Sequence, residues 1–449
     1  MLDSYLKIGM KIENNFDAVR REVKYKGKNG VLYFLSTLTS SVQIMGIIES
    51  LVNVDITKYV SKEIYVGPIS YDDDYKNILK LCLSGVACLI LDDYDKAIMI
   101  ETREYPTRSI SEPTTEKTIR GSKDGFNESI NTNIGLIRRR IRDKNLTIDL
   151  FSIGKKSKTD VALIYLDDCV DEKIKNEIKL KLNNIDVDSL VMSDRALEEI
   201  IFKQNKSLFP LVRYTERPDV ASIELYQGKM IIMVDTSASV IITPTTIFDH
   251  VHHVEEYRES PFAGTFLRLI RNLSIILSIF LIPLWLALVT ETDINNYFIL
   301  KPSKETAIPI IVQILLAELF MEMIRIAIVH TPSELTSAIS MVSAIILGSV
   351  SIELKIFLPE ILVYVSFETI ASFATPSYEL SNANKLTKYY LLFLTALFGR
   401  VGFLIGTTIF ICYLSSVNIL GIPYLYPIVP FDIRKAGSLF FRRKGNKTL

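Results

Sequence analysis

The chain has 449 residues, 49% of them hydrophobic, and its 51 basic residues balance its 51 acidic residues. A net charge of zero produces no field that attracts a polyanion, so the composition argues against nucleic acid as a partner. The mean hydropathy of +0.26 is high for a soluble protein, and the length allows two or three domains.

The N-terminal residues and the cysteines indicate that the first part of the chain is cytoplasmic. The opening stretch, MLDSYLKIGMKIENNFD, carries charges in every turn and no apolar core, so we expect no cleavable signal peptide. Cys82, Cys88, Cys169 and Cys412 lack CxxC spacing, which argues against a zinc site, a redox pair or a disulfide framework. A reducing compartment fits this pattern best.

Residues 1–255 are predicted to form a cytoplasmic α/β domain with room for two subdomains. Three segments rich in β-branched or alternating apolar residues predict strands: 82–101, 159–168 and 221–243. Within the last of them, Gly228 is expected at a hairpin. Segment 171–185, DEKIKNEIKLKLNNI, repeats its apolar residues at helical spacing and predicts a helix.

Segment 31–52, VLYFLSTLTSSVQIMGIIESLV, is the apolar stretch of this half that most resembles a membrane span. Polar residues interrupt it repeatedly between Ser36 and Gln43. Because a span needs a more continuous apolar run, we expect a buried helix here.

Residues 104–143 alternate acidic and basic side chains and end in the basic cluster RRRIRD. We expect a turn-rich loop that leads into a helix near Gly125, with Asp124 as its N-cap and the basic residues near its C-terminal end. The sequence RGSKDG lacks the GK[ST] of a phosphate-binding loop, so nucleotide binding is poorly supported. The opposite charges fit either a salt-bridged surface or an interlocking contact between subunits.

The sequence DHVHHVEE, residues 249–256, holds three of the four histidines and could in principle ligate zinc or nickel. It lacks the HExxH pattern, and a polar connector before the first membrane segment explains it more simply. No GxSxG motif or Cys/His pair is readable elsewhere. We therefore expect no enzyme activity, no metal site and no cofactor.

Beyond residue 256 the chain contains apolar segments of about the length that crosses a bilayer as a helix. We expect a helical transmembrane domain over 256–418, with four to six membrane segments, and a basic cytoplasmic tail over 419–449. The expected spans are 272–291, 335–352, 356–374, 389–416 and the charged candidate 307–329.

Basic residues near the first span and in the tail place both ends of the membrane domain inside, which demands an even number of crossings. Five segments contradict this parity. Either segment 307–329 lies at the membrane interface, or segment 419–431 partly re-enters the membrane, or one loop charge misplaces an end.

Charged residues within these apolar segments are the candidate functional residues. Glu318, Glu322 and Arg325 recur at i, i+4 and i+7, which puts them in one polar stripe of a helix. An ionisable group at the bilayer centre costs at least about 2.5 kcal/mol, so these groups need partners or water. With them we group Glu360, Glu368 and Arg400. The six residues form either static ion pairs between helices or a hydrated path.

Gly402 and Gly406 have GxxxG spacing in the last predicted span, which lets two helix backbones approach closely. Packing within the chain and contact between subunits both fit this pattern.

Two motifs of the N-terminal half resemble the A-subunit family of bacterial spore germinant receptors (GerA type). The family pattern PSRS, EP, E, RG, GF, ES, TN and LIRRRI is met by Pro106, Arg108, Ser109, Glu112, Pro113, Glu116, Arg120, Gly121, Gly125, Phe126, Glu128, Ser129, Thr132, Asn133 and residues 136–141. The second motif is RYTERPDV, residues 213–220. The resemblance covers about residues 60–430. Segments 252–268 and 373–385 resemble most the branch of stage V sporulation protein AF.

The resemblance implies a multi-pass protein of the spore inner membrane with a cytoplasmic N-terminal domain. It also implies an oligomer of this chain, within the lipid bilayer and beside other germination membrane proteins. The motif residues are then expected to serve assembly: Arg108, Glu112, Glu116, Arg120, Gly121, Arg138, Arg139, Arg140, Arg213, Glu216 and Arg217.

The expected function is a subunit of an oligomeric ion channel or channel-like complex that releases ions across the spore inner membrane. The charged residues of the membrane segments would line or brace its path. The alternatives are a non-conducting scaffold or signal-relay subunit that organises receptor complexes, and an ion-coupled transporter.

Overall fold

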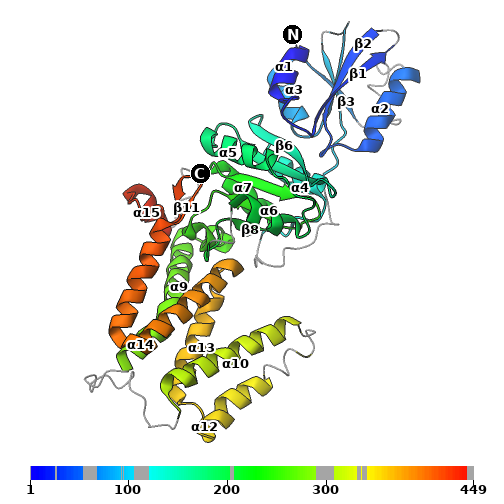
Figure 1. The fold of residues 1–449 in the computed structure, drawn as a ribbon. Coiled ribbons are helices and arrows are strands. Elements are labelled where there is room, and N and C mark those ends of the chain that lie inside the picture. The colour runs from blue at the N-terminus through cyan, green and yellow to red at the C-terminus, as the bar shows by residue number, and fades with distance from the viewer. Residues whose placement is uncertain are drawn as a thin grey trace.

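The computed structural model places two α/β subdomains at the N-terminal end and a body of long helices at the other (Figure 1). This arrangement confirms the predicted fold class. The structure describes residues 2–25, 28–53, 68–92, 94, 96–105, 121–202, 207–289, 308–330, 335 and 341–441.

The first subdomain is a five-stranded antiparallel sheet in the order β1-β2-β4-β5-β3, with helices on both faces. Helices α1 and α3 cover one face and α2 covers the other. Its elements are α1 (Leu2–Gly9), β1 (Ala18–Tyr25), β2 (Lys28–Leu35), α2 (Ser41–Asn53), β3 (Ile69–Asp72), α3 (Tyr75–Cys82), β4 (Ala87–Leu91) and β5 (Ala97–Ile100).

The second subdomain repeats this topology, with the strand order β6-β7-β9-β10-β8. Helices α4 and α7 cover one face, and α5 and α6 cover the other, so the central strands are buried along their length and lose the alternation of a half-exposed sheet. Its elements are α4 (Ile130–Arg140), β6 (Leu146–Ile153), β7 (Thr159–Leu166), α5 (Glu172–Asn183), α6 (Ser193–Phe202), β8 (Arg213–Thr215), α7 (Pro218–Tyr226), β9 (Met230–Val234) and β10 (Val240–Thr243).

A buried ion pair joins the two subdomains. Arg138 of α4 donates from Nε and Nη2 to both carboxylate oxygens of Asp17, at 3.0 and 2.9 Å, and both side chains are almost fully buried. Beside it, the Ile148 amide donates to Asn15 Oδ1 at 2.8 Å. Because burying charges costs several kcal/mol unless they are paired, this contact requires a defined arrangement of the two subdomains.

The helical body begins after a short connector formed by η3 (Ile247–His250) and α8 (Val254–Arg258). Two described helices, α9 (Pro261–Val289) and α14 (Tyr378–Ser416), are long and apolar enough to cross a membrane by length and composition. The remaining elements of the body and its C-terminal end are α10 (Ile310–His330), η4 (Ile346–Val350), α12 (Ser351–Glu353), α13 (Pro359–Phe373), β11 (Asn418–Ile419), β12 (Ile422–Pro423) and α15 (Ile433–Phe440).

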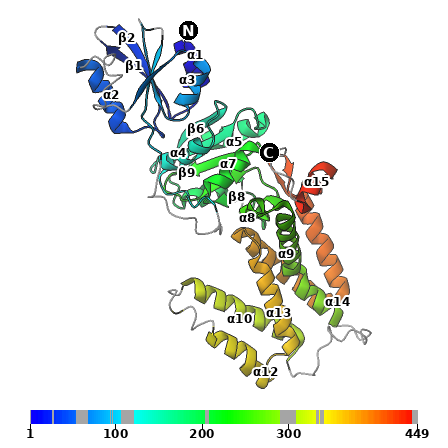
Figure 2. The same cartoon turned by 180° about the vertical axis from the view of Figure 1, so that it is seen from behind.

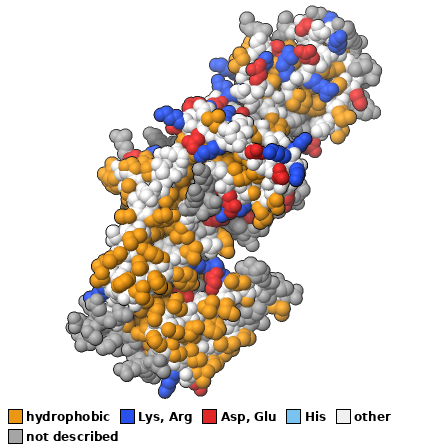
Figure 3. Space-filling view, in the orientation of Figure 1, with side chains coloured by type: hydrophobic (Ala, Val, Ile, Leu, Met, Phe, Trp, Pro, Cys, Tyr) orange, Lys and Arg blue, Asp and Glu red, His pale blue; other side chains and the backbone are white. Residues whose placement is uncertain are grey.

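On the face that Figure 3 shows, apolar side chains predominate over the helical body, whereas most charged side chains lie on the two α/β subdomains. On α14, Phe393, Phe398 and Leu404 are each more than 60% exposed. A soluble protein of this size does not leave so large a continuous apolar surface in water, so this surface is suited to lipid.

Helix α14 is bent back on itself at Gly399, which has φ 58° and ψ −137°. A Cβ atom on Gly406 would lie 3.0 Å from the side chains of Leu391 and Leu394, a contact that a straight helix could not make. Leu380 and Phe410 likewise share one apolar cluster. The element therefore consists of two antiparallel arms, 378–398 and 400–416, and the span predicted as 389–416 was wrong in its bounds.

The C-terminal end of the helical body returns to the second subdomain. Ile419 and Tyr424 pack with Phe209, and Asn272 of α9 donates to the Leu439 carbonyl of α15 at 3.4 Å. Both views place α15 beside the end of α9 that carries the connector (Figures 1 and 2).

Three local predictions were wrong. Segment 31–52 is not one buried helix, because its first part pairs with β1 as strand β2 and its second part forms α2. Gly228, with φ 83°, ends α7 and leads into β9, so it is not at a hairpin. The N-cap position of α4 is Ser129, and Asp124 instead pairs with Arg140 at 2.6 Å.

Candidate functional site

Three buried charges meet where α10, α13 and α14 pack together in the helical body. Lys388 Nζ of α14 lies 2.7 Å from Glu318 Oε2 of α10 and 3.0 Å from Glu368 Oε2 of α13. All three side chains are at most 7% exposed. We call Glu318, Glu368 and Lys388 the buried triad. One ammonium group here pairs with two acidic side chains from different helices.

A second set of charges lies one turn further along the same two helices. Glu322 of α10 accepts from Lys385 Nζ at 3.0 Å and from Arg325 of its own helix. Glu318 and Glu322 are four residues apart, and Lys385 and Lys388 are three apart, so each pair lies on one helix face. The stripe of acids on α10 therefore matches a stripe of lysines on the first arm of α14.

The hydrogen bonding of the buried triad is incomplete within the described residues. Glu318 Oε1 and Glu368 Oε1 are buried and have no hydrogen-bond partner there. A buried carboxylate oxygen normally accepts at least one hydrogen bond, from protein or from water. Each of these carboxylates thus offers one oxygen that water or an ion can contact.

The structure brings four of the six predicted membrane residues together: Glu318, Glu322, Arg325 and Glu368. The other two are half-buried elsewhere in the body. Glu360 is in the first turn of α13, about 12 Å along that helix from Glu368. Arg400 follows the Gly399 turn, on the second arm of α14.

Sequence reasoning missed Lys385 and Lys388, which provide the partners of the acids. The predicted span began at residue 389, so both lysines were left outside the membrane domain's charged residues. The signal was present, because two lysines at i and i+3 precede an apolar helix and complement two acids at i and i+4 of another. A search for basic residues whose spacing in one apolar segment matches that of the acids in another would have identified Lys385 and Lys388.

Most motif arginines of the second subdomain form ion pairs inside the chain. Arg213 Nη1 lies 3.1 Å from Glu224, and Arg217 Nη2 lies 2.8 Å from Asp219. Arg138 and Arg140 pair with Asp17 and Asp124 as described above, and Arg139 lies over the ring of Tyr105 at 5.3 Å. Gly121 has φ 125°, and the Glu216 carbonyl accepts from the Phe126 amide at 2.8 Å. Arg108, Glu112, Glu116 and Arg120 lie outside the described residues.

The connector joins the second subdomain to α9 through charge pairs. Lys229 Nζ lies 2.7 Å from Glu224 and 2.7 Å from Asp249. Burial raises the pKa of Asp249, but the Lys229 ammonium outweighs this effect and holds that pKa well below its usual range. Glu256, fully buried on α8, pairs with Arg268 of α9 at 2.7 Å and with Arg271.

The histidines that were considered as metal ligands have other surroundings. Burial and then the Arg213 guanidinium lower the pKa of His250 to about 3, and burial and then Arg268 lower the pKa of His252 to about 3. The His253 side chain accepts from the Glu255 amide as the N-cap of α8. Within the described part of the chain, no three His, Cys, Asp or Glu side chains lie close enough to hold a metal ion.

Comparison with known proteins gives a consistent group of relatives. A family model described as Bacillus/Clostridium GerA spore germination protein matches residues 6–448. Stage V sporulation protein AF of Bacillus subtilis (strain 168) is 39% identical, over 96% of this chain and 89% of its own length. Spore germination protein KA of the same organism is 28% identical, over 96% and 82%.

Two further comparisons concern a membrane relative and a solved structure. A Bacillus subtilis protein named uncharacterized membrane protein YfkQ is 30% identical, over 84% of this chain and 74% of its own. The crystal structure of the N-terminal domain of the A subunit of the Bacillus megaterium spore germinant receptor GerK3 is 25% identical, with a TM-score of 0.41. It covers 54% of this chain and 92% of the solved one.

Proposed function

The chain belongs to the GerA family of spore germination proteins, and on that premise we propose that it is a subunit of an oligomeric ion channel that releases ions across the spore inner membrane. The observation that supports this proposal is the buried triad. Three charged side chains lie in the interior of a helical body that exposes many large apolar side chains. Charges at this position need protein partners or water, and they mark ion paths in many membrane proteins.

The buried triad suits an ion path better than a purely structural role, because each of its two carboxyl groups has one oxygen atom without a hydrogen-bond partner among the described residues. Glu318 and Glu368 each bind Lys388 through one oxygen and leave the other without a hydrogen bond within the described residues. A static ion pair that only stabilises packing gains most when every polar atom is paired. Water that satisfies these oxygens would hydrate the contact between α10, α13 and α14.

Ion flux through the purified full-length chain in liposomes tests the proposal. We expect flux from the unmodified protein, and a change of at least several-fold in the Glu318→Gln and Glu368→Gln variants. Glu353→Gln is the matched control, because Glu353 is an exposed acid at the end of α12. Absence of flux, or equal flux in all four proteins, would remove the channel proposal.

A signal-relay role is the second candidate, and the connector favours it. The Lys229–Asp249 pair joins the second subdomain to the connector, and the Glu256–Arg268 pair joins the connector to α9, the first helix of the body. Such a chain of buried charges can transmit a displacement of the α/β subdomains to the helices. If this role is the only one, residues 1–255 alone bind the other germination membrane proteins, and neutralising the triad affects only stability.

A further inference from the structure

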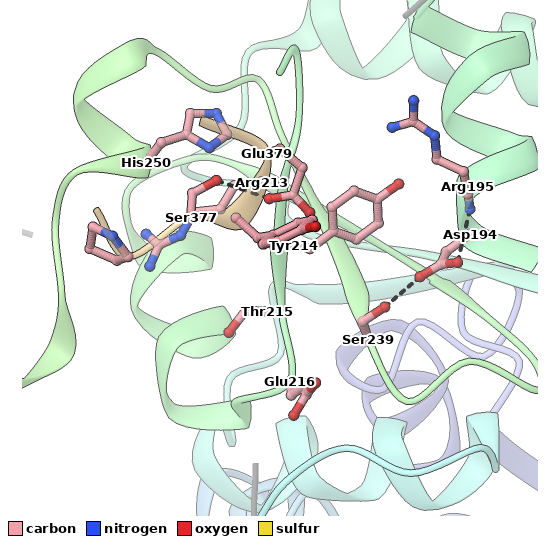
Figure 4. Close-up of a pocket in the computed structure, with 12 residues that line it drawn as sticks. Asp194, Arg195, Arg213, Tyr214, Thr215, Glu216, Ser239, His250, Ser377 and Glu379 are labelled. Carbon is pink, nitrogen blue, oxygen red and sulfur yellow. Dashed lines mark hydrogen bonds between the residues drawn. The ribbon is translucent and has the colours of Figure 1, made fainter. Parts of the chain in front are cut away.

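Two segments that are far apart in the sequence line one cavity between the second subdomain and the helical body (Figure 4). Residues 213–216 belong to the second subdomain, and residues 376–379 join α13 to α14. The cavity encloses about 320 Å³, several times the roughly 30 Å³ that one water molecule occupies in the liquid. Arg195 and Tyr378 of its lining are exposed, so water enters the cavity from outside the protein.

Buried polar atoms without hydrogen-bond partners begin at the end of the cavity where His250 lies. Figure 4 places His250 and Ser377 at this end and Asp194 at the other. His250 is 1% exposed, and neither of its ring nitrogens has a partner within the described residues. Thr375, two residues before Ser377, is 8% exposed, and its Oγ1 likewise has no partner there.

Unpartnered groups of the same kind continue into the helical body towards the buried triad. Asn384 of α14 is 3% exposed, and both polar atoms of its side chain lack a partner among the residues that the structure describes. It lies one turn before Lys388 on the same helix face. The Thr375 amide donates to the Ser372 carbonyl at 3.2 Å and so continues the last turn of α13. Thr375 therefore lies on the helix face that carries Glu368, about 10 Å along the axis.

Burial alone does not explain these unpartnered groups, because other hydroxyl groups on the same two helices have partners. Thr387 Oγ1 donates to the Ala383 carbonyl at 2.9 Å, and Ser372 Oγ donates to the Thr369 carbonyl at 2.7 Å. The backbone of a helix can thus satisfy a buried hydroxyl group of its own. The hydroxyl of Thr375 and the amide of Asn384 make no such bond, so they need another partner.

A buried polar group without a hydrogen bond costs free energy, and proteins satisfy such groups with ordered water where no side chain does so. We infer that water enters the helical body at the His250 end of the cavity, passes Thr375 and Asn384, and reaches the unpartnered oxygens of the buried triad. This route is the entrance of the ion path on the side of the α/β subdomains, a step that rests on the proposed function.

Reaction of a cysteine at position 384 with 2-aminoethyl methanethiosulfonate, a small water-soluble reagent, tests the entry of water without a measurement of flux. Asn384→Cys and Thr387→Cys are each made with Cys169→Ser and Cys412→Ser, because these two cysteines are exposed and the other two are buried. The mass of the detergent-solubilised full-length protein reports the reaction. We expect modification at least about tenfold faster at position 384 than at position 387.

Ion flux through the full-length protein in liposomes tests whether this water lies on the ion path. Thr375→Val replaces a hydroxyl with a methyl group of similar size, and Asn384→Leu replaces an amide with an apolar group. We expect each variant to lower the flux at least about fivefold, because apolar groups at a narrow entrance expel water. Thr387→Val is the matched control and should keep the flux of the unmodified protein, since the Thr387 hydroxyl is satisfied within its own helix.

Equal rates of modification at positions 384 and 387 would overturn the inference. Flux that Thr375→Val and Asn384→Leu both leave unchanged, while Glu318→Gln alters it, would also overturn the inference and leave the proposed function standing. Absence of flux from the unmodified protein would remove the proposed function instead, and the modification rates would still decide whether water reaches position 384. The melting temperature of each variant separates loss of the entrance from loss of the fold.

Discussion

Lys388 is the residue on which the buried triad depends, because its single ammonium pairs with carboxyl groups of two different helices. Replacing it with methionine would leave Glu318 and Glu368 buried without a cation. Removing one partner of a buried pair costs about 3–5 kcal/mol, so Lys388→Met should lower the melting temperature of the detergent-solubilised protein markedly.

The same reasoning predicts a rescue. The triple variant Lys388→Met, Glu318→Gln, Glu368→Gln removes every charge of the triad and should recover part of the lost stability, since uncharged amides are cheaper to bury. Lys173→Met, on the exposed side of α5, is the control for loss of a lysine. A triple variant less stable than Lys388→Met would show that the carboxylates are not the source of the cost.

His250 and His252 should make the stability of the protein depend on pH. Their folded pKa of about 3 lies below the ordinary value of 6.5, so between these values the unfolded chain binds protons that the folded chain does not. Stability is therefore complete above about pH 6.5 and falls as the pH drops, by up to about 1.4 kcal/mol per unit for each histidine.

Melting temperatures between pH 7.5 and 4.5 measure this effect. The His252→Gln variant should show a shallower decline than the unmodified protein, because one of the two proton-linked groups is absent. His253→Gln is the comparison, as His253 is the next residue after His252 but its side chain caps helix α8 instead. Identical slopes in all three proteins would contradict the assignment.

At the scale of elements, the sequence predicted what local periodicity determines. Helix α5 and the strands β4, β5 and β7 follow from apolar spacing and turn residues. The prediction from the sequence was wrong where tertiary contacts determine the secondary structure. The segment ASIELY has strand-like composition but forms most of α7, because α7 packs with α4 on the central strands.

The candidate site was predictable in part for the same reason. The acids of α10 stand out as charges in an apolar segment, and the sequence assigned them to one helix face. Their lysine partners did not stand out, because Lys385 and Lys388 follow polar residues at the start of α14 and resemble a loop. The cavity at residues 213–216 and 376–379 has no local signal at all, since it exists only after two distant motifs meet.

The turn of α14 at Gly399 can be tested by a substitution at that residue. Its φ of 58° with ψ of −137° lies in a region that residues with a Cβ atom rarely adopt, and holding such a residue there costs about 1–3 kcal/mol. A Cβ atom at this position would meet nothing within 4 Å, so the cost of Gly399→Ala is conformational and not a collision. We expect a lower melting temperature.

Gly348 provides a matched control for this prediction. A Cβ atom there also meets nothing within 4 Å, but Gly348 lies inside a helical turn and does not have positive φ. Gly348→Ala should therefore be neutral or slightly stabilising. Equal melting temperatures for the two variants would mean that α14 does not turn back at Gly399 in the membrane.

At the scale of the whole molecule, the turn at Gly399 changes how many membrane crossings we propose. With α14 counted as two arms, the described residues of the body form six helical segments: α9, α10, residues 341–353, α13 and the two arms. Helices α10 and α12 lie side by side in both views (Figures 1 and 2), so we count the segments that contain them as two crossings. An even number agrees with basic residues at both ends of the body.

We therefore propose six crossings, with the α/β subdomains and α15 on one face of the membrane and the Gly399 turn on the other. Labelling with a membrane-impermeant maleimide in oriented vesicles tests this topology. Cys169 is exposed on the second subdomain, and Phe440→Cys would report on α15. Both should react in vesicles of one orientation only. Phe398→Cys, exposed beside the turn and made in a Cys412→Ser background, should react only in vesicles of the opposite orientation.

The length of the two α14 arms determines what labelling at these three positions means. Each arm of α14 is about 25–31 Å long at 1.5 Å per residue, close to the roughly 30 Å of the hydrocarbon core, so the turn must reach the far face if both arms span it. Labelling of position 398 from the same face as Cys169 would mean that the arms of α14 lie along the membrane surface. Lys388, near the middle of the first arm, would then lie outside the hydrocarbon, and the buried triad could not contribute to an ion path.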